Sequence, residues 1–565
     1  MSTLLSLRRL VILLLPISIT LTAYLYLYPI FHGCSFPTPD GSHAGAFSRT
    51  AADHAGLPLP SNNNFAPFRL LALGDPQLEG DSSIPSSTKP LAPFLEGLRV
   101  DPKDSQSAFA SWLNLPRRGL VYILQDIPLS LKKWRKHLDL VGNDYYLAHI
   151  YRAIHWWTNP THVTVLGDLL GSQWVTDEEF ALRGSRFWER VFPGSQRVED
   201  DITNGTNIDI LGGNGTSWSN RLMNIVGNHD IGYGGDIVAS RVERFERTFG
   251  KINWNVRFQL PGSSPDENRT DSVDEAVELR IVILNTLNLD SPVYDQRLQG
   301  ETYNFLNEVI LSSRDVQDKK VATVLLTHVP LHKDQGVCVD GPFFAYNEQR
   351  YGGGISEQNH LSYEASKSIL ESLYGMSPDP NAVGRGLGRQ GIILTGHDHA
   401  GCDVYHHVPP LSPEQDTDRR WKAVPWSDSA AVASAESIPG IREVTVRSMM
   451  GDFGGNAGLL SGWFDINTST WRFEYTTCAL GTQHIWWMIH IIDLVTVIGI
   501  LVLISSSIYE IVAPDLSPNG SVKRPLTAKG RAKDAPNDDT EDMRRTKDAI
   551  EKGPARKRHS RCTRD

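Results

Sequence analysis

The chain has 565 residues and a formal net charge of −10, and apolar and charged residues make up 40% and 21% of it. This composition is typical of globular proteins and excludes a wholly disordered or fibrous chain. The negative balance argues against a nucleic-acid binder that works by bulk charge. Five cysteines are too few for a scaffold built on disulfides, and none forms a Cys-x-x-Cys pair. Any metal site is therefore expected to use His and carboxylate side chains.

The first element is an uncharged apolar run at residues 10–30, which directly follows Arg8 and Arg9. About 20 apolar residues cross a bilayer, and this run is longer than the apolar core of a typical cleaved signal peptide. A cleaved signal peptide is the alternative reading. We predict an uncleaved transmembrane signal anchor at residues 10–30, preceded by a cytoplasmic N-terminus at residues 1–9.

A second apolar run, residues 486–508, is predicted to be a transmembrane helix near the other end of the chain. It begins with Trp486 and Trp487, and paired tryptophans are typical of the membrane interface. Asp493 lies inside this run. It marks either a contact with another helix or partner, or the lumenal headgroup boundary.

The positive-inside rule predicts the orientation of the region between the two runs. The tail at residues 513–565 is basic and lacks aromatic residues, which predicts a disordered cytoplasmic tail. The intervening region is then lumenal or extracellular, with a linker at residues 31–67 and a large domain, taken as lumenal, at residues 68–478. Four glycosylation sequons agree with that side: Asn204, Asn214, Asn268 and Asn467. Four cysteines would face an oxidising space, so one or two disulfides are expected, with the pairing left open: Cys34, Cys338, Cys402 and Cys478.

The large domain contains short apolar runs that each end in a polar residue. They lie at residues 68–74, 161–167, 221–227, 321–327 and 391–396. Such runs suit strands buried on both faces, and helical patterns occur between them at residues 145–157, 178–191 and 301–311. The sequence therefore predicts an α/β fold, with a late β-rich stretch at residues 443–475 as the second sheet of a four-layer α/β/β/α sandwich. Two segments exceed a minimal domain and are predicted to be surface insertions near the substrate entrance: residues 80–142 and 194–220.

The polar residues after these strands form five motif blocks. In chain order they are Gly74-Asp75-Pro76-Gln77, Gly167-Asp168, Gly227-Asn228-His229-Asp230, Thr327-His328 and Gly396-His397-Asp398-His399. A two-ion centre for phosphoryl transfer needs carboxylate and imidazole ligands on rigid strand ends, including one carboxylate that bridges the ions. Each block alone is a weak signal, but all five in this order predict a dinuclear metal centre.

These blocks resemble the signature of the calcineurin-like metallophosphoesterases, and the resemblance covers about residues 69–475. It implies that Asp168 bridges two divalent ions. One ion would also take Asp75, Gln77 and His399, and the other Asn228, His328 and His397. His229 would be the catalytic residue, because in the family it points at the scissile phosphate. Asp230 either orients His229 or caps a helix.

The first block departs from the family pattern, because Gln77 stands where most members have His. An amide oxygen is a harder ligand than an imidazole and favours Mn²⁺ or Mg²⁺. The two ions are therefore expected to be Mn²⁺, with Mg²⁺, Fe or Zn²⁺ as alternatives. A Gly-rich segment at residues 351–360 either contacts the ligand or forms a lid without contacts.

A narrower resemblance, to the fungal Ted/Cdc-type branch and the animal post-GPI-attachment phosphoesterase, rests on Asp75-Pro76-Gln77-Leu78 and the two apolar runs. It implies an endoplasmic-reticulum or early Golgi membrane enzyme that removes ethanolamine phosphate from a mannose of the GPI glycan before export. GPI-anchored proteins or GPI lipid would be its substrate, with cargo receptors as further partners and no nucleic acid. The alternatives are another lumenal phosphoesterase, acting on nucleotides or lipids, and a non-catalytic cargo-sorting protein.

Overall fold

The computed structural model describes residues 2–41, 43–57, 65–84, 124, 127–204, 208–212, 218–261, 276–409, 420–430 and 438–512. The sequons at Asn214 and Asn268, the tail at residues 513–565 and most of residues 80–126 lie outside this part of the chain. The other two sequon asparagines, Asn204 and Asn467, are exposed. The described residues form a mixed α/β structure with two main sheets and a two-stranded ribbon.

The first sheet has the strand order β16-β15-β1-β2-β5-β3. Its centre is parallel, because β1 pairs with β2 and β2 with β5 in the same direction, whereas β15 runs antiparallel to β1. The bounds are β1 Phe68–Leu73, β2 His162–Val165, β3 Gln196–Arg197, β5 Arg221–Asn224, β15 Asn456–Asp465 and β16 Thr470–Ala479. The strands predicted before Asp75, Asp168 and Asn228 are therefore neighbours in one sheet.

The second sheet has the order β13-β12-β14-β11-β8-β7-β6-β4. The strands predicted before His328 and His397 are β8 and β11, which pair in parallel. The bounds are β4 Ile208–Ile210, β6 Trp254–Gln259, β7 Glu278–Ile283, β8 Val321–Leu326, β11 Gln390–Thr395, β12 Cys402–His407, β13 Lys422–Pro425 and β14 Gly440–Thr445. The ribbon pairs β9 Phe344–Tyr346 with β10 Ile355–Gln358.

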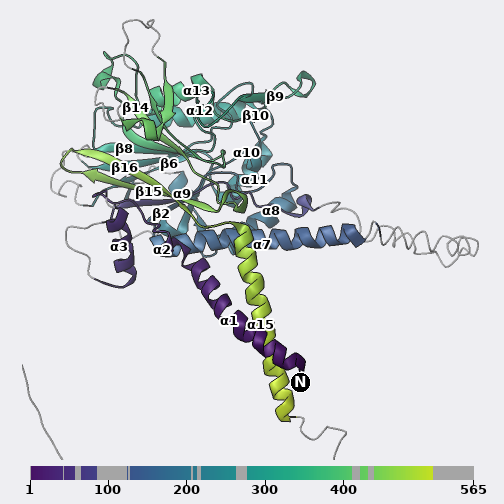
Figure 1. Ribbon diagram of the computed structural model, residues 1–565. Helices are drawn as coiled ribbons and strands as arrows, with labels where there is room; N and C mark the ends of the chain where they lie inside the picture. The colour runs from purple at the N-terminus through teal and green to yellow at the C-terminus, as the bar shows by residue number, and fades with distance from the viewer. Residues whose placement is uncertain are drawn as a thin grey trace, which may run out of the picture. The chain divides into compact units, whose positions relative to one another are not determined.

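Alternate residues of the central strands enter two hydrophobic cores, because successive side chains of a strand point to opposite faces. In β1, Leu70 and Ala72 join a core shared with strands of the second sheet, such as Val324 of β8. Leu71 and Leu73 join the other core, which contains the helices. These helices are α7 Ile127–Thr158, α8 Asp177–Arg186, α11 Ala239–Phe249, α12 Gln296–Leu311 and α13 Tyr363–Ser368. Figure 1 shows α7 along the first sheet and α12 and α13 beside the second.

The structure corrects two expectations about the domain. The β-rich stretch at residues 443–475 does not form the second sheet by itself, because β15 and β16 extend the first sheet beside β1 while β14 joins the second. The predicted insertions also contain parts of the fold. Residues 127–142 are the first half of α7, and residues 194–220 supply edge strands to both sheets through β3 and β4.

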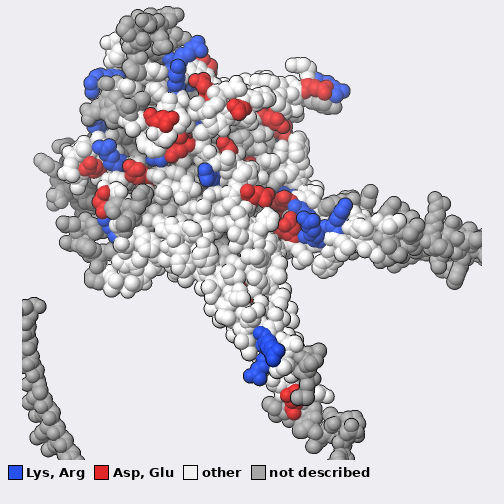
Figure 2. All heavy atoms as spheres, viewed as in Figure 1, with Lys and Arg blue, Asp and Glu red and all other residues white. Residues whose placement is uncertain are grey.

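Two terminal helices are long and apolar enough to cross a membrane, over Leu4–Tyr26 and Gln483–Glu510. They belong to α1 Ser2–Tyr26 and α15 Gln483–Val512. The first span therefore ends before residue 30, and α2 Tyr28–Phe31 follows as a separate short helix that packs on α7. Figure 2 shows α1 and α15 largely without charged side chains, except for basic and acidic side chains near their end far from the domain.

Asp493 forms a helix–helix contact, which confirms the first of the two readings of this residue. Its carboxylate accepts hydrogen bonds from Ser18 Oγ at 2.6 Å and Thr22 Oγ1 at 2.8 Å, both on α1. A carboxyl group inside an apolar helix is costly without such partners. These two bonds fix α1 against α15.

The segment after α1 is tied to the domain. Cys34 forms a disulfide with Cys478 at the end of β16, and its carbonyl accepts a hydrogen bond from Trp157 Nε1 on α7 at 2.6 Å. The helix α3 His43–His54 also contacts α7 through a hydrogen bond between His54 Nε2 and the Trp157 carbonyl. The second disulfide joins Cys338 to Cys402.

Candidate metal centre

The five motif blocks meet where the two sheets face each other. Asp75, Asp168 and Asn228 follow adjacent strands of the first sheet, whereas His328 and His397 follow adjacent strands of the second. Ligands bind beyond the carboxyl ends of parallel strands. All seven residues predicted to bind metal, together with His229, are therefore brought to the same place.

Asp168 lies at the centre of this group and is 1% exposed. Its Oδ1 accepts the backbone N–H of His229 at 2.8 Å and lies 3.4 Å from His328 Nε2. Its Oδ2 accepts a hydrogen bond from Gln77 Nε2 at 3.0 Å. The carboxylate thus faces residues from both predicted ligand sets.

One half of the site is formed by Asp75, Asp168 and His399, whose candidate ligand atoms all lie within 4.8 Å of one another. Gln77 lies between two of them, with its amide nitrogen 3.0 Å from Asp168 Oδ2 and 3.1 Å from His399 Nε2. A half-turn of the amide would bring its oxygen to the same position. The unusual Gln77 is therefore within reach of a ligand role.

The other half is formed by Asn228, His328 and His397. Asn228 Oδ1 lies 2.9 Å from His328 Nε2 and 3.0 Å from His397 Nδ1. The opposite ring nitrogens bond to backbone carbonyls, His328 Nδ1 to Leu166 at 2.7 Å and His397 Nε2 to Gln358 at 2.7 Å. This is the usual arrangement of metal-binding histidines, because the carbonyl fixes the tautomer and leaves the other nitrogen for the ion.

The backbone at the site is strained. Asp75, Gln77, Asp168 and His397 have φ angles of 42°, 42°, 49° and 76°, in the left-handed region that non-glycine residues rarely adopt. Such strain is common at functional sites, where the surroundings over-determine it. Gly227 is required for another reason, since a Cβ there would lie 2.2 Å from Asp168 Oδ1.

The electrostatics fit divalent cations. Burial and the neighbouring Asp168 raise the pKa of Asp75 well above its usual range. Burial would also raise the pKa of Asp168, but the nearby His328, His229 and His397 lower it. Burial lowers the pKa of His397 to about 3 and also lowers those of His328 and His399. Neutral imidazoles and paired carboxylates form a donor set that binds divalent metal ions.

His229 and Asp230 have different roles. The His229 side chain is 39% exposed, with Nε2 3.8 Å from Asp168 Oδ2, so its ring can reach a ligand above the carboxylate. Asp230 is buried and accepts N–H bonds from Gly227, Leu169 and Leu170. Of its two expected roles, the structure supports capping: Asp230 caps the short helix α10 Asn228–Ile231 and ties it to the Asp168 loop.

A cavity of about 470 Å³, the Lys333 cavity, adjoins the centre. Its walls include Lys333, His360, His397, His399 and Phe453. The Gly-rich segment at residues 351–360 supplies His360 to this wall, and its Gln358 carbonyl bonds His397 Nε2.

A buried ionic cluster behind this wall was not predicted. Lys333 Nζ lies 2.6 Å from Glu443 Oε1, and His406 Nε2 lies 2.6 Å from Glu443 Oε2. Its members are far apart in the chain, so no local pattern marks them. Asp403, close to His399 in sequence, pairs with Arg442 and takes no part in the centre.

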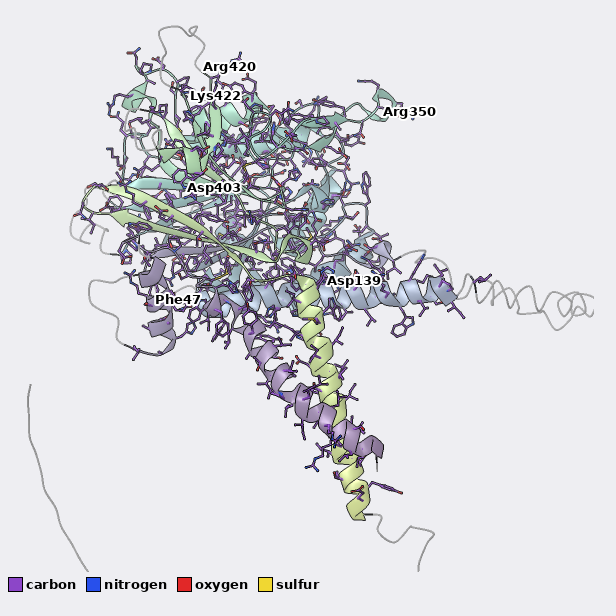
Figure 3. All side chains as sticks on the ribbon, in the orientation of Figure 1. Phe47, Asp139, Arg350, Asp403, Arg420 and Lys422 are labelled. Atoms are coloured by element: carbon purple, nitrogen blue, oxygen red, sulfur yellow. A yellow bond between two sulfur atoms is a disulfide. The ribbon has the colours of Figure 1, made fainter. Side chains whose placement is uncertain are left out.

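A second cavity of about 420 Å³, the Gln77 cavity, also adjoins the centre. Its lining includes Gln77 and, from the first turns of α15, Gln483, His484 and Trp487. Three carboxylates also line this cavity: Glu79, Asp139 and Asp452. Asp139 lies on α7 near the start of α15 (Figure 3).

No family model matches the chain. Protein TED1 of Saccharomyces cerevisiae is 32% identical over 407 residues, which are 64% of this chain and 76% of that protein. An uncharacterized protein of Schizosaccharomyces pombe is 25% identical over 65% of this chain and 81% of its own length. Metallophosphoesterase 1 of Cricetulus griseus is 24% identical over 49% of this chain and 59% of its own length. These relatives confirm the resemblance derived from the motif blocks, and the chain belongs to the TED1 and metallophosphoesterase 1 branch of the metallophosphoesterases.

Proposed function

We propose that the protein is a two-metal phosphodiesterase of the secretory pathway that removes ethanolamine phosphate from a mannose of the GPI glycan before export from the endoplasmic reticulum. The observation that carries the proposal is the convergence of seven motif residues from both sheets around Asp168. One hydrophobic core joins strands of the two sheets and the other contains the helices. These two cores support the four-layer α/β/β/α arrangement that this family implies.

The ligand sets follow from the two halves of the site. Asp75, Gln77 and His399 would hold one ion, and Asn228, His328 and His397 the other, with Asp168 shared between them. The locked tautomers of His328 and His397 and the raised pKa of the buried Asp75 support this assignment. Two divalent ions, most simply Mn²⁺, would activate the attacking water and neutralise charge on the phosphate.

The remaining chemistry falls to His229. Its backbone N–H is held by Asp168 Oδ1, and its ring is the exposed group beside the centre. From there it would donate a hydrogen bond to a phosphate oxygen and a proton to the departing sugar alkoxide. Asp230 keeps the His229 backbone in place by accepting N–H bonds from Gly227, at the start of the same short helix, and from Leu170 in the Asp168 loop.

The Gln77 cavity supports a membrane-held substrate with a cationic group. It runs from the centre to the first turns of α15, so a lipid-linked glycan at the membrane surface would need to extend only a short way to reach Asp168. Glu79 also pairs with Lys136, but Asp452 is exposed and would attract the ethanolamine ammonium at the cavity wall. GPI lipid or GPI-anchored proteins, with cargo receptors as further partners, fit this arrangement.

The same proposal places the domain in the lumen and the tail after residue 512 in the cytoplasm. Two disulfides and two exposed sequon asparagines support a lumenal domain. The bonds from Ser18 and Thr22 to Asp493 support retention of α1 as an uncleaved anchor.

The test uses the full-length protein in detergent with a synthetic mannoside that carries ethanolamine phosphate. We expect release of ethanolamine phosphate that a chelator abolishes and Mn²⁺ restores, and that His229→Ala reduces by orders of magnitude without loss of bound metal. Hydrolysis of a chromogenic bis-ester but not of the mannoside would favour another lumenal phosphoesterase. No hydrolysis of either compound with metal bound would favour a non-catalytic cargo-sorting protein.

A further inference from the structure

A third cavity lies outside the centre, where α7 crosses α1 and α15. We call it the crossing cavity. Its volume is about 620 Å³, and most of its wall is apolar or aromatic. The lining includes Tyr26, Tyr145, His149, Arg152, Trp156 and Trp486. The cavity is therefore built from the first helix, the last helix and the long helix between them (Figure 1).

Close packing fixes this crossing. A Cβ at Gly142 of α7 would lie 1.7 Å from the Trp487 ring, so only glycine lets α15 approach α7 here. The ring of Tyr26 on α1 lies 4.9 Å from that of His149 on α7, edge to face. Tyr146 on α7 contacts Trp486 on α15 in the same way. The cavity walls are thus held by contacts among all three helices.

The outer face of α7 carries exposed apolar side chains at helical spacing. They are Leu131, Trp134, Leu138, Val141, Tyr145 and Trp156. Steps of three and four residues from Leu131 to Tyr145, and then one of eleven residues, about three turns, to Trp156, put them along one stripe. This stripe passes Tyr145 and Trp156 of the cavity wall. The helices α1 and α15 are long and apolar enough to cross a membrane, and the stripe on α7 reaches the cavity at their ends. Contact of this stripe with the lipid surface explains why its apolar side chains are exposed. The crossing cavity then opens at the level of the lipid headgroups.

Two buried polar groups in the cavity wall have no partner among the described residues. His149 is 5% exposed and neither of its ring nitrogens has a hydrogen-bond partner, and Trp486 is 6% exposed with its Nε1 unpaired. Unsatisfied buried donors are rare and each costs free energy. Burial lowers the pKa of His149 to about 4, so its ring is neutral and offers one donor and one acceptor.

The charge of the wall indicates the kind of ligand. Arg152 is exposed and is the one Lys, Arg, Asp or Glu side chain among the described residues lining the cavity. A ligand that satisfies this wall has an acidic group for Arg152, oxygen acceptors for Trp486 Nε1 and His149, and an apolar part for the aromatic rings. These are the parts of a glycerophospholipid.

We propose that the crossing cavity binds one glycerophospholipid of the lumenal leaflet, with its phosphate at Arg152 and its ester oxygens at Trp486 and His149. The bound lipid completes the junction of α1, α7 and α15 and keeps the start of α15, which also lines the Gln77 cavity, at a fixed height relative to the membrane. The proposal does not depend on the substrate of the metal centre.

Native mass spectrometry of the full-length protein in detergent tests it, with dioctanoyl phosphatidylinositol and dioctanoyl phosphatidylcholine as added probes. We expect one saturable lipid per protein. Arg152→Gln and Trp486→Phe should each weaken binding by about tenfold, since each removes one hydrogen-bonding group and leaves most of the packing. Arg135→Gln is the matched control, because Arg135 is exposed on the same helix but does not line the cavity.

The outcomes separate the possibilities. If Arg152→Gln weakens the binding of both lipids equally, the result supports a contact with the phosphate. A preference of the wild type for phosphatidylinositol adds a contact with the headgroup. Binding of inorganic phosphate at the same site without lipid would overturn the proposal. Lipid adducts that do not saturate would also overturn the proposal. The same holds if Arg152→Gln and Trp486→Phe bind as much lipid as the wild type while thermal unfolding shows that both variants are folded.

Discussion

The carboxylate of Glu443 neutralises the buried ammonium group of Lys333 beside the metal centre. Glu443→Gln should therefore destabilise the protein by about 3 kcal/mol. The carboxylate is fully buried, and it bonds Lys333 Nζ, His406 Nε2 and the backbone N–H of Leu331. Glutamine keeps an oxygen for two of these donors. It removes the charge that neutralises Lys333, which is itself 3% exposed.

The magnitude follows from the pKa of Glu443. Burial alone would raise it, but Lys333 and His406 lower it from 4.5 to about 2. A shift of this size corresponds to about 3 kcal/mol of preferential stabilisation of the ionised form. For a domain of this size that loss lowers the melting temperature by roughly 3–4 °C. Differential scanning fluorimetry of the full-length protein in detergent measures it.

The pH dependence has a definite sign. Because folding depresses this pKa, the stabilisation is fully present above the unfolded value near 4.5 and is lost as the pH falls toward 2. The difference in melting temperature between wild type and Glu443→Gln should stay constant above pH about 5 and shrink below it. Lys333→Met combined with Glu443→Gln is the control, because it removes the stranded charge and should recover most of the loss. If the double variant loses as much stability as the two single variants lose together, the reasoning is refuted.

Gln77→Ala should raise the Mn²⁺ concentration needed for half-maximal activity, and excess metal should restore turnover. Gln77→His should be tolerated. Unchanged metal dependence in both variants would remove Gln77 from the ligand set. Ser18→Ala with Thr22→Val should destabilise the detergent-solubilised protein by roughly 1–2 kcal/mol, because Asp493 loses both partners. Adding Asp493→Leu to this double variant should restore the stability. If the double variant is as stable as the wild type, the helices do not rely on Asp493. In intact microsomes, protease should remove the tail after residue 512 and spare the domain, and digestion of the domain would reverse the orientation.

The parts of the fold that follow from local patterns could be predicted from the sequence. Each of the five motif blocks follows a strand whose apolar run is readable by itself, and the order of the blocks indicated a common site before any contact was known. Asp493 was also recognisable as a residue that needs a partner, although Ser18 could not be identified as that partner from so far along the chain.

The parts that depend on distant pairing could not be predicted. The pairing of β15 with β1 assigns the late strands to the first sheet, and no property of the β15 sequence specifies which sheet edge it joins. Glu443 looks like any strand residue until Lys333 and His406 are seen around it. The length of α7 does not follow from the sequence, because its first half packs little and carries a basic run at residues 132–136 that is typical of a surface segment.

The central claim is tested most directly by mass spectrometry of GPI glycans from cells that lack the protein and express either the wild type or Asp168→Asn. Asp168 faces both predicted ion positions, so the amide should weaken both and abolish turnover while the fold stays intact. We expect an extra ethanolamine phosphate on a mannose in the null cells, its removal by the wild type, and its persistence with Asp168→Asn. A normal glycan profile in the null cells, with no related enzyme present, or full rescue by Asp168→Asn would contradict the account.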